Sequence, residues 1–152
     1  VLAWLFKLQG RDKEAVGVLE EILEIAPDML SAQMSCGELW TKLQFYDKAE
    51  EAYRKAIELT PNLAGGYAAL AGLLVRTRSK LPEARQLAQK AVELEPLANF
   101  YLLLAMACRA DNDLPAARDA IEGAIGLAPG NKEYRDILKM IDQQIGTTGR
   151  QD

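Results

Sequence analysis

The chain contains no histidine among its 152 residues, and it has only two cysteines. Without histidine it lacks the commonest general base and metal ligand, and neither a Ser-His-Asp nor a Cys-His catalytic arrangement can form. No Cys-x-x-Cys pair and no Gly-rich phosphate-binding loop occur. We therefore expect a protein that is not an enzyme and that has no cofactor or metal site.

Positive charge and long apolar runs are also scarce. The formal net charge is −4 and the isoelectric point is near 5.0, which argues against nucleic acid as a partner. No stretch of about 18 apolar residues is present, so we expect no membrane insertion. We expect a soluble protein and favour the cytoplasm. Export remains the alternative, because a targeting signal could precede Val1.

The feature that the sequence does contain is a repeat, which is clearest in residues 30–63. Two amphipathic helical patterns are separated there by a short turn and closed by a proline. Gly37 and Trp40 share one face of the first pattern, and Ala49 and Tyr53 share one face of the second. A helix pair of this length cannot bury its own apolar face, so it needs neighbours of the same kind.

A succession of Ala, a position that is usually large and apolar, a small or apolar residue and Pro occurs four times in phase. Its prolines, at spacings of 34, 35 and 33 residues, are Pro27, Pro61, Pro96 and Pro129. This pattern resembles the tetratricopeptide repeat, which has a period of about 34 residues and two antiparallel helices per repeat. The small residue and the large residue of the family's first helix correspond to Ala3, Gly37, Ala71 and Ala105, and to Phe6, Trp40, Leu74 and Cys108.

The resemblance implies an all-α fold, a right-handed α-solenoid of antiparallel helix pairs. We expect a single domain over residues 1–145, made of repeats at about 1–29, 30–63, 64–97 and 98–131 and a capping helix at 132–145, with a disordered tail at 146–152. The repeat departs from the family pattern at an insertion near 77–80, at a deletion around Leu97 and at Ala88. Cys36 and Cys108 fall on core-facing positions two repeats apart, so we expect buried thiols and no disulfide.

The pattern also predicts where each helix begins and ends. The expected helices cover residues 1–9, 13–25, 30–43, 47–59, 64–77, 82–94, 98–110, 115–127 and 132–145. Pro82 and Pro115 fall in the first turn of a helix, where the missing N–H has no cost. On an exposed face, we expect ion pairs between Glu50 and Arg54 and between Glu51 and Lys55.

The first helix, residues 1–9, is apolar on every side, which is typical of a covered helix. Either an upstream repeat covers it in a longer protein, or another chain does. We favour the first explanation, and we therefore expect the sequence to be a fragment of a longer multi-repeat protein.

Three charged clusters have ordinary structural explanations. Asp111–Asp113 resembles the start of a calcium loop, but the required Gly and Glu do not follow, and the repeat needs a turn there. We expect Glu20, Glu21 and Glu24 to form a solvated helix face. We expect Arg76, Arg78 and Lys80 to lie in a solvated loop.

The resemblance further implies a concave groove lined by the first helix of each repeat. The positions that correspond to ligand-contacting residues are Trp4, Lys7, Leu8, Met34, Glu38, Thr41, Lys42, Ala68, Gly72, Val75, Arg76, Asn99, Leu102, Met106 and Arg109. Its walls are apolar, and three cations at one edge, Lys42, Arg76 and Arg109, could bind a partner's carboxylates. Packing between neighbouring helices is the simpler explanation for Ala68 and Gly72.

Some members of the family hold a chaperone's C-terminus in a carboxylate clamp. Where the clamp has asparagine, this sequence has Trp4, Glu38, Gly72 and Met106, so we do not expect chaperone-tail binding. We expect a non-catalytic scaffold or adaptor that binds an unidentified protein or peptide, as an apolar helix or an extended segment, in the groove. The alternative is a structural or oligomerisation module that self-associates through residues 1–9.

Overall fold

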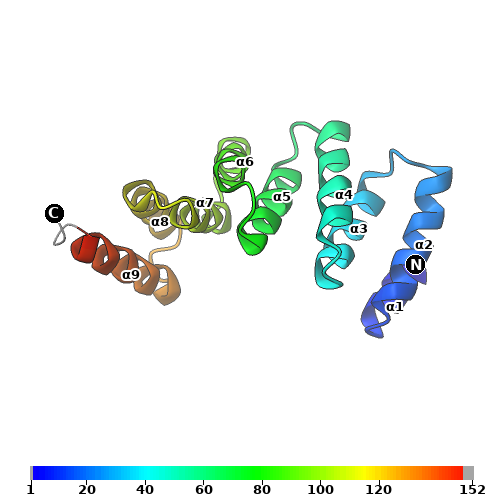
Figure 1. The fold of residues 1–152 in the computed structure, drawn as a ribbon, viewed down its shortest axis with the longest axis horizontal. Coiled ribbons are helices and arrows are strands. Elements are labelled where there is room, and N and C mark those ends of the chain that lie inside the picture. The colour runs from blue at the N-terminus through cyan, green and yellow to red at the C-terminus, as the bar shows by residue number, and fades with distance from the viewer. Residues whose placement is uncertain (1, 149–152) are drawn as a thin grey trace.

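The structure is a computed structural model that describes residues 2–148. Within these residues the chain forms nine α-helices joined by short turns, and no strand. The helices are α1 (Leu2–Leu8), α2 (Asp12–Ile25), α3 (Leu30–Lys42), α4 (Tyr46–Leu59), α5 (Ala64–Thr77), α6 (Leu81–Leu94), α7 (Ala98–Ala110), α8 (Leu114–Leu127) and α9 (Lys132–Thr148). They succeed one another along the long axis, so the two ends of the chain lie at opposite ends of an extended array (Figure 1).

Eight helices match the expected ranges within one residue at nearly every end, and the ninth is longer than expected. The capping helix α9 continues to Thr148, so the prediction that it ends at residue 145 was wrong. Gly146 does not interrupt it, and the Thr147 hydroxyl donates a hydrogen bond to the Gln144 carbonyl at 2.8 Å. Residues 149–152 of the expected disordered tail lie outside the described residues.

The turn within each helix pair depends on residues with left-handed backbone. Gly10, Gln44 and Asn112 each supply one such residue, with φ of 70°, 65° and 62°. The third pair carries the inserted residue and needs two, Arg78 and Lys80, with φ of 51° and 47°. The insertion is therefore absorbed in the turn and leaves α5 and α6 at full length.

Each helix packs mainly on its neighbours in sequence, with further contacts from α3 to α5 and from α5 to α7 (Figure 1). The buried side chains form three clusters: one over α1–α4, one over α3–α6 and one over α5–α9. Trp40 contacts both the first and second clusters, and Val75 and Leu87 contact both the second and third. This nearest-neighbour packing is what a repeat solenoid requires.

Small residues let the helices approach closely. The alanine that begins the repeated motif in each second helix, at positions 15, 49, 84 and 117, is fully buried. Gly37 lies under the ring of Tyr53, and a Cβ added at this glycine would come within 2.4 Å of the tyrosine Cε1 atom. The small residue of the first helix thus makes room for the large residue of the second.

Both cysteines are buried free thiols, as expected. Burial, reinforced by the charge of Glu20, raises the pKa of Cys36 to about 11, and burial also raises the pKa of Cys108. Both therefore act as small apolar side chains at neutral pH. Separately, in the part of the chain that the structure describes, no helix is both long enough and apolar enough to cross a membrane.

Candidate protein-binding groove

The residues expected in the groove all lie on α1, α3, α5 and α7. Leu8 is 64% exposed, and none of the other fourteen is fully buried. Half of them are exposed: Trp4, Glu38, Lys42, Arg76, Asn99, Met106 and Arg109. The other half are partly buried: Lys7, Met34, Thr41, Ala68, Gly72, Val75 and Leu102. Among the apolar ones, Leu102 packs against the core, whereas Trp4 and Met106 expose 61% and 48% of their surface.

On α1 and α3, the polar residues expected in the groove are all engaged within the protein. The Lys7 ammonium lies 3.0 Å from a carboxylate oxygen of Glu38, which joins α1 to α3. Lys42 is paired with Asp12 at 2.7 Å. The other two cations expected at the groove edge, Arg76 and Arg109, have no such acidic partner among the described residues. Thr41 donates its hydroxyl hydrogen to the Gly37 carbonyl at 2.8 Å.

In the C-terminal half, the ends of α5, α7 and α9 surround a cavity of about 560 Å³, which we call the arginine pocket. Its lining residues are Val75, Arg78, Met106, Arg109, Ala110, Asn112, Leu114, Gln144 and Thr147. Three of them, Val75, Met106 and Arg109, were expected in the groove. Arg78, Leu114, Gln144 and Thr147 were not, because the turn and the capping helix were not expected to contribute to it.

The charged side chains that line the arginine pocket are all positive. None of its lining residues is acidic, although the chain as a whole has a net charge of −4. Arg78 and Arg109, and Arg76 nearby in sequence, form no ion pair with any of the described residues. The pocket therefore combines uncompensated guanidinium groups with the apolar side chains of Val75, Met106 and Leu114.

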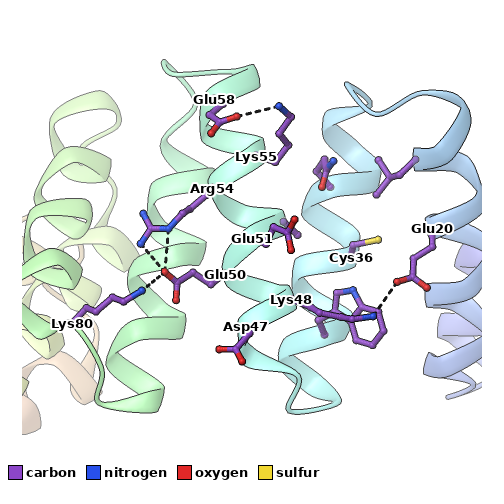
Figure 2. Close-up of a pocket in the computed structure, with 14 residues that line it drawn as sticks. Glu20, Cys36, Asp47, Lys48, Glu50, Glu51, Arg54, Lys55, Glu58 and Lys80 are labelled. Carbon is purple, nitrogen blue, oxygen red and sulfur yellow. Dashed lines mark hydrogen bonds and ion pairs between the residues drawn. The ribbon is translucent and has the colours of Figure 1, made fainter.

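A larger cavity of about 820 Å³ lies between α2, α3 and α4 (Figure 2). Five carboxylates and four basic side chains line it, and all four basic side chains are paired within the protein. The pairs are Lys48 with Glu20 at 3.5 Å, Arg54 with Glu50 at 2.7 Å, Lys55 with Glu58 at 3.1 Å, and Lys80 with Glu50. The expected pair of Glu50 and Arg54 is present, whereas the expected pair of Glu51 and Lys55 is replaced by Lys55 and Glu58.

Two of these pairs lie within α4, and the other two join α4 to α2 and to the turn before α6. Glu50 accepts hydrogen bonds from Arg54 on its own helix and from Lys80 in the turn before α6 (Figure 2). Arg54 also donates to Glu83 of α6 at 2.8 Å. Burial opposes ionisation of Glu50, but the hydrogen bonds from Lys80 and Arg54 outweigh it and lower its pKa. The larger cavity thus contains a structural ion-pair network with its basic groups already engaged.

The acidic clusters noted in the sequence do not form a metal site: no group of three or more His, Cys, Asp or Glu side chains among the described residues is placed to hold an ion. Asp113 is the N-cap of α8 and accepts a hydrogen bond from the Ala116 amide at 3.0 Å. Asn112, before it, has the left-handed backbone of the turn. The turn interpretation of Asp111–Asp113 is therefore confirmed.

Comparison with known proteins agrees with this architecture. Family models described as tetratricopeptide repeat match residues 1–33, 41–63 and 69–132. The chain belongs to the tetratricopeptide repeat family. Domains of this family are generally non-catalytic and bind other proteins, and the solenoid of helix pairs described above is their fold.

One curated relative is Protein O-mannosyl-transferase Tmtc1 of Drosophila melanogaster, which is 31% identical over 101 residues. That match includes 63% of this chain but only 12% of the relative, so the chain spans a small part of the length of that relative. The similarity therefore concerns the repeats.

Two solved structures show the same fold. The crystal structure of MamA has a TM-score of 0.89 and 18% identity over 96% of this chain and 85% of MamA. The first tetratricopeptide domain of Spaghetti (RPAP3), solved with the HSP90 peptide SRMEEVD, has a TM-score of 0.72 and 24% identity. That match covers 77% of this chain and 93% of the Spaghetti domain.

Proposed function

We propose that this tetratricopeptide domain is a non-catalytic scaffold or adaptor that binds an apolar helix or an extended peptide of another protein in its concave groove. The observation that carries the proposal is the exposed Met106 on the groove side of α7, beside a cavity large enough for a partner's side chain. Methionine adapts its shape to varied apolar partners, and an exposed one on a repeat surface favours binding over packing. The peptide-bound Spaghetti domain shares this fold and supports the same class of function.

Selection of peptides by the whole chain tests the proposal without a known partner. A displayed library of random 12-residue peptides would be selected on the wild type, on Met106→Glu and on Met29→Glu. Met29 is the matched control, since it is 45% exposed and lies outside the groove. We expect apolar-containing peptides to bind the wild type and Met29→Glu, and to bind Met106→Glu at least tenfold more weakly. Peptides that bind all three proteins equally would contradict the groove proposal.

A second candidate is oligomerisation through α1. Four apolar side chains of this helix are exposed, led by Leu8 at 64% and Trp4 at 61%. Because monomeric proteins rarely expose contiguous apolar patches, a second copy could cover this helix. If so, sedimentation of the wild type should show dimers at micromolar concentration, and Leu8→Glu should be monomeric. A wild type that stays monomeric up to about 100 µM, well above the affinity range of stable dimers, would exclude this candidate.

A further inference from the structure

The arginine pocket differs from every other basic region of the described chain. Most of the described lysines and arginines have an acidic partner within 4.0 Å, and the unpaired ones outside this region are Lys13, Lys132 and Arg135. Arg76, Arg78 and Arg109, by contrast, gather at the C-terminal ends of α5 and α7. Arg78 and Arg109 line one cavity that no carboxylate of the described residues lines, so an anion bound there would interact favourably with both positive charges.

The acids closest in sequence to Arg109 are not available to neutralise it. Asp113 lies 2.7 Å and Asp111 lies 3.8 Å from the guanidinium of Arg85 on α6. Asp113 also caps α8 through the Ala116 amide. Arg85 thus holds both acids of this turn away from the arginine pocket, and the pocket keeps its positive charge.

The turn that carries Arg78 is held in one conformation. The Arg78 amide donates to the Val75 carbonyl at 3.2 Å, and the Ser79 amide donates to the Leu74 carbonyl at 3.1 Å. The hydroxyl groups of Thr77 and Ser79 are hydrogen-bonded to each other at 2.8 Å. A ligand that binds Arg78 therefore does not have to order its backbone, which lowers the entropy cost of binding.

Apolar side chains line the same cavity as Arg78 and Arg109. Val75, Met106 and Leu114 line the pocket itself. Met140, which is exposed, lies one turn before the pocket-lining Gln144 on the same face of α9. The guanidinium groups of Arg78 and Arg109 can each donate two parallel hydrogen bonds, and apolar side chains lie beside them. This combination suits a carboxylate with an apolar side chain next to it better than it suits a bare phosphate.

We propose that the arginine pocket binds an acidic segment of a partner protein, with carboxylates on Arg78 and Arg109 and a neighbouring apolar side chain against Met106 and Leu114. The proposal rests on the groove function proposed above and specifies the chemistry of the partner at one end of that groove. A volume of about 560 Å³ is in the range of ligand pockets and accommodates a few side chains. The site does not reproduce the family's carboxylate clamp, because Trp4, Glu38, Gly72 and Met106 replace its asparagines.

The test compares two double variants that remove the same charge. Arg78→Gln with Arg109→Gln changes the pocket, and Lys13→Gln with Lys132→Gln removes two unpaired cations elsewhere. Random 12-residue peptides selected on the wild type should be enriched in Asp and Glu next to apolar residues. An acidic peptide from this selection, measured by fluorescence anisotropy, should bind the arginine variant at least tenfold more weakly and the lysine variant within about twofold. Its Gln-substituted version should bind the wild type as weakly as the acidic peptide binds the arginine variant.

Three outcomes would overturn the proposal. Selected peptides that are apolar, depend on Met106 and are no more acidic than the starting library would leave the groove function intact and remove the acidic partner. A failure to select any peptide that depends on Met106 would remove both proposals. Tighter, arginine-dependent binding of a 12-nucleotide single-stranded DNA than of the acidic peptide would assign the pocket to nucleic acid. Circular dichroism and thermal unfolding of both double variants would establish that they are folded.

Discussion

At the scale of single residues, the packing of each helix pair depends on matching a small side chain with a large one. Tyr53 lies over Gly37 in the second repeat, and Tyr101 lies over Gly123 in the fourth. In the second repeat the glycine is on the first helix and the tyrosine on the second, and in the fourth repeat these places are exchanged. In both pairs a tyrosine ring thus fills the space beside a glycine, but the ring comes from the second helix in one repeat and from the first helix in the other.

We predict that Gly37→Ala and Gly17→Ala change stability in opposite directions. The new methyl group at Gly37 would overlap the buried ring of Tyr53, which should lower the free energy of unfolding by about 1–3 kcal/mol. The methyl group at Gly17, also within a helix, meets no atom within 4 Å, and alanine favours helix by about 0.5–1 kcal/mol. Urea unfolding of both variants measures the difference. If both variants were stabilised, the close packing of Tyr53 on Gly37 would be refuted.

The sequence predicted individual residues well where the repeat determines them. The burial of Cys36 and Cys108 followed from their repeat positions, whereas the place of Arg78 in the lining of the arginine pocket did not. Its position depends on how an inserted residue is accommodated, and a left-handed turn at Arg78 and Lys80 leaves no periodic signal. The partner of Lys55 was also missed, because residues three and four positions apart are almost equally close on a helix.

At the scale of elements, ion pairs join α4 to α6 and to the turn before it, although α4 and α6 are not consecutive in the chain. Glu50 on α4 is the common partner of Arg54 and of Lys80, and Arg54 continues the network to Glu83 on α6. Removing Glu50 would leave two basic groups without their shared acid. The adjacent Glu51, which is exposed, forms no ion pair within the described residues and provides a matched control.

We predict that Glu50→Gln lowers the free energy of unfolding at pH 7 by about 1–2 kcal/mol, and that Glu51→Gln changes it by less than about 0.5 kcal/mol. The pKa of Glu50 is lowered in the folded state, so its carboxylate stabilises the fold above the ordinary pKa of 4.5. This contribution is lost as the pH falls from 4.5 through the folded-state pKa. The wild type and Glu50→Gln should therefore converge in urea unfolding at low pH. A difference between them that does not change with pH would contradict an electrostatic role.

The bounds of the helices were predictable because turn residues, prolines and apolar periodicity all repeat in phase. The exception is α9, which continues through Gly146, and its last turn is maintained by local hydrogen bonds such as that of Thr147. That extra turn has a consequence for the site. It places Thr147 in the lining of the arginine pocket, where a helix ending at residue 145 could not reach.

At the scale of the whole molecule, the core consists of three clusters in a row. Ile141 of α9 is fully buried in the cluster over α5–α9 and has no part in the cluster over α1–α4. In such an array, stability is approximately the sum of local terms and of interfaces between neighbours. A substitution that destabilises the repeats at one end should therefore have little effect on the stability of the other end.

We predict that Ile141→Ala destabilises the C-terminal repeats alone. The cavity left by the deleted carbon atoms should cost about 2–5 kcal/mol locally. Amide hydrogen exchange should become faster in α7–α9 and stay unchanged in α1–α4. Met140→Ala is the control, since Met140 is exposed and adjacent in sequence. A uniform increase in exchange along the chain would show that the array unfolds as one cooperative unit.

Because adjoining clusters share so few side chains, we expect the array to deform elastically under force. Trp40 is the shared contact between the first and second clusters, and Val75 and Leu87 are the shared contacts between the second and third. Bending or twisting strain should concentrate where these shared side chains lie, on α3 and on α5 and α6. A pulling force on the two ends should then bend the array at these places before any helix unwinds.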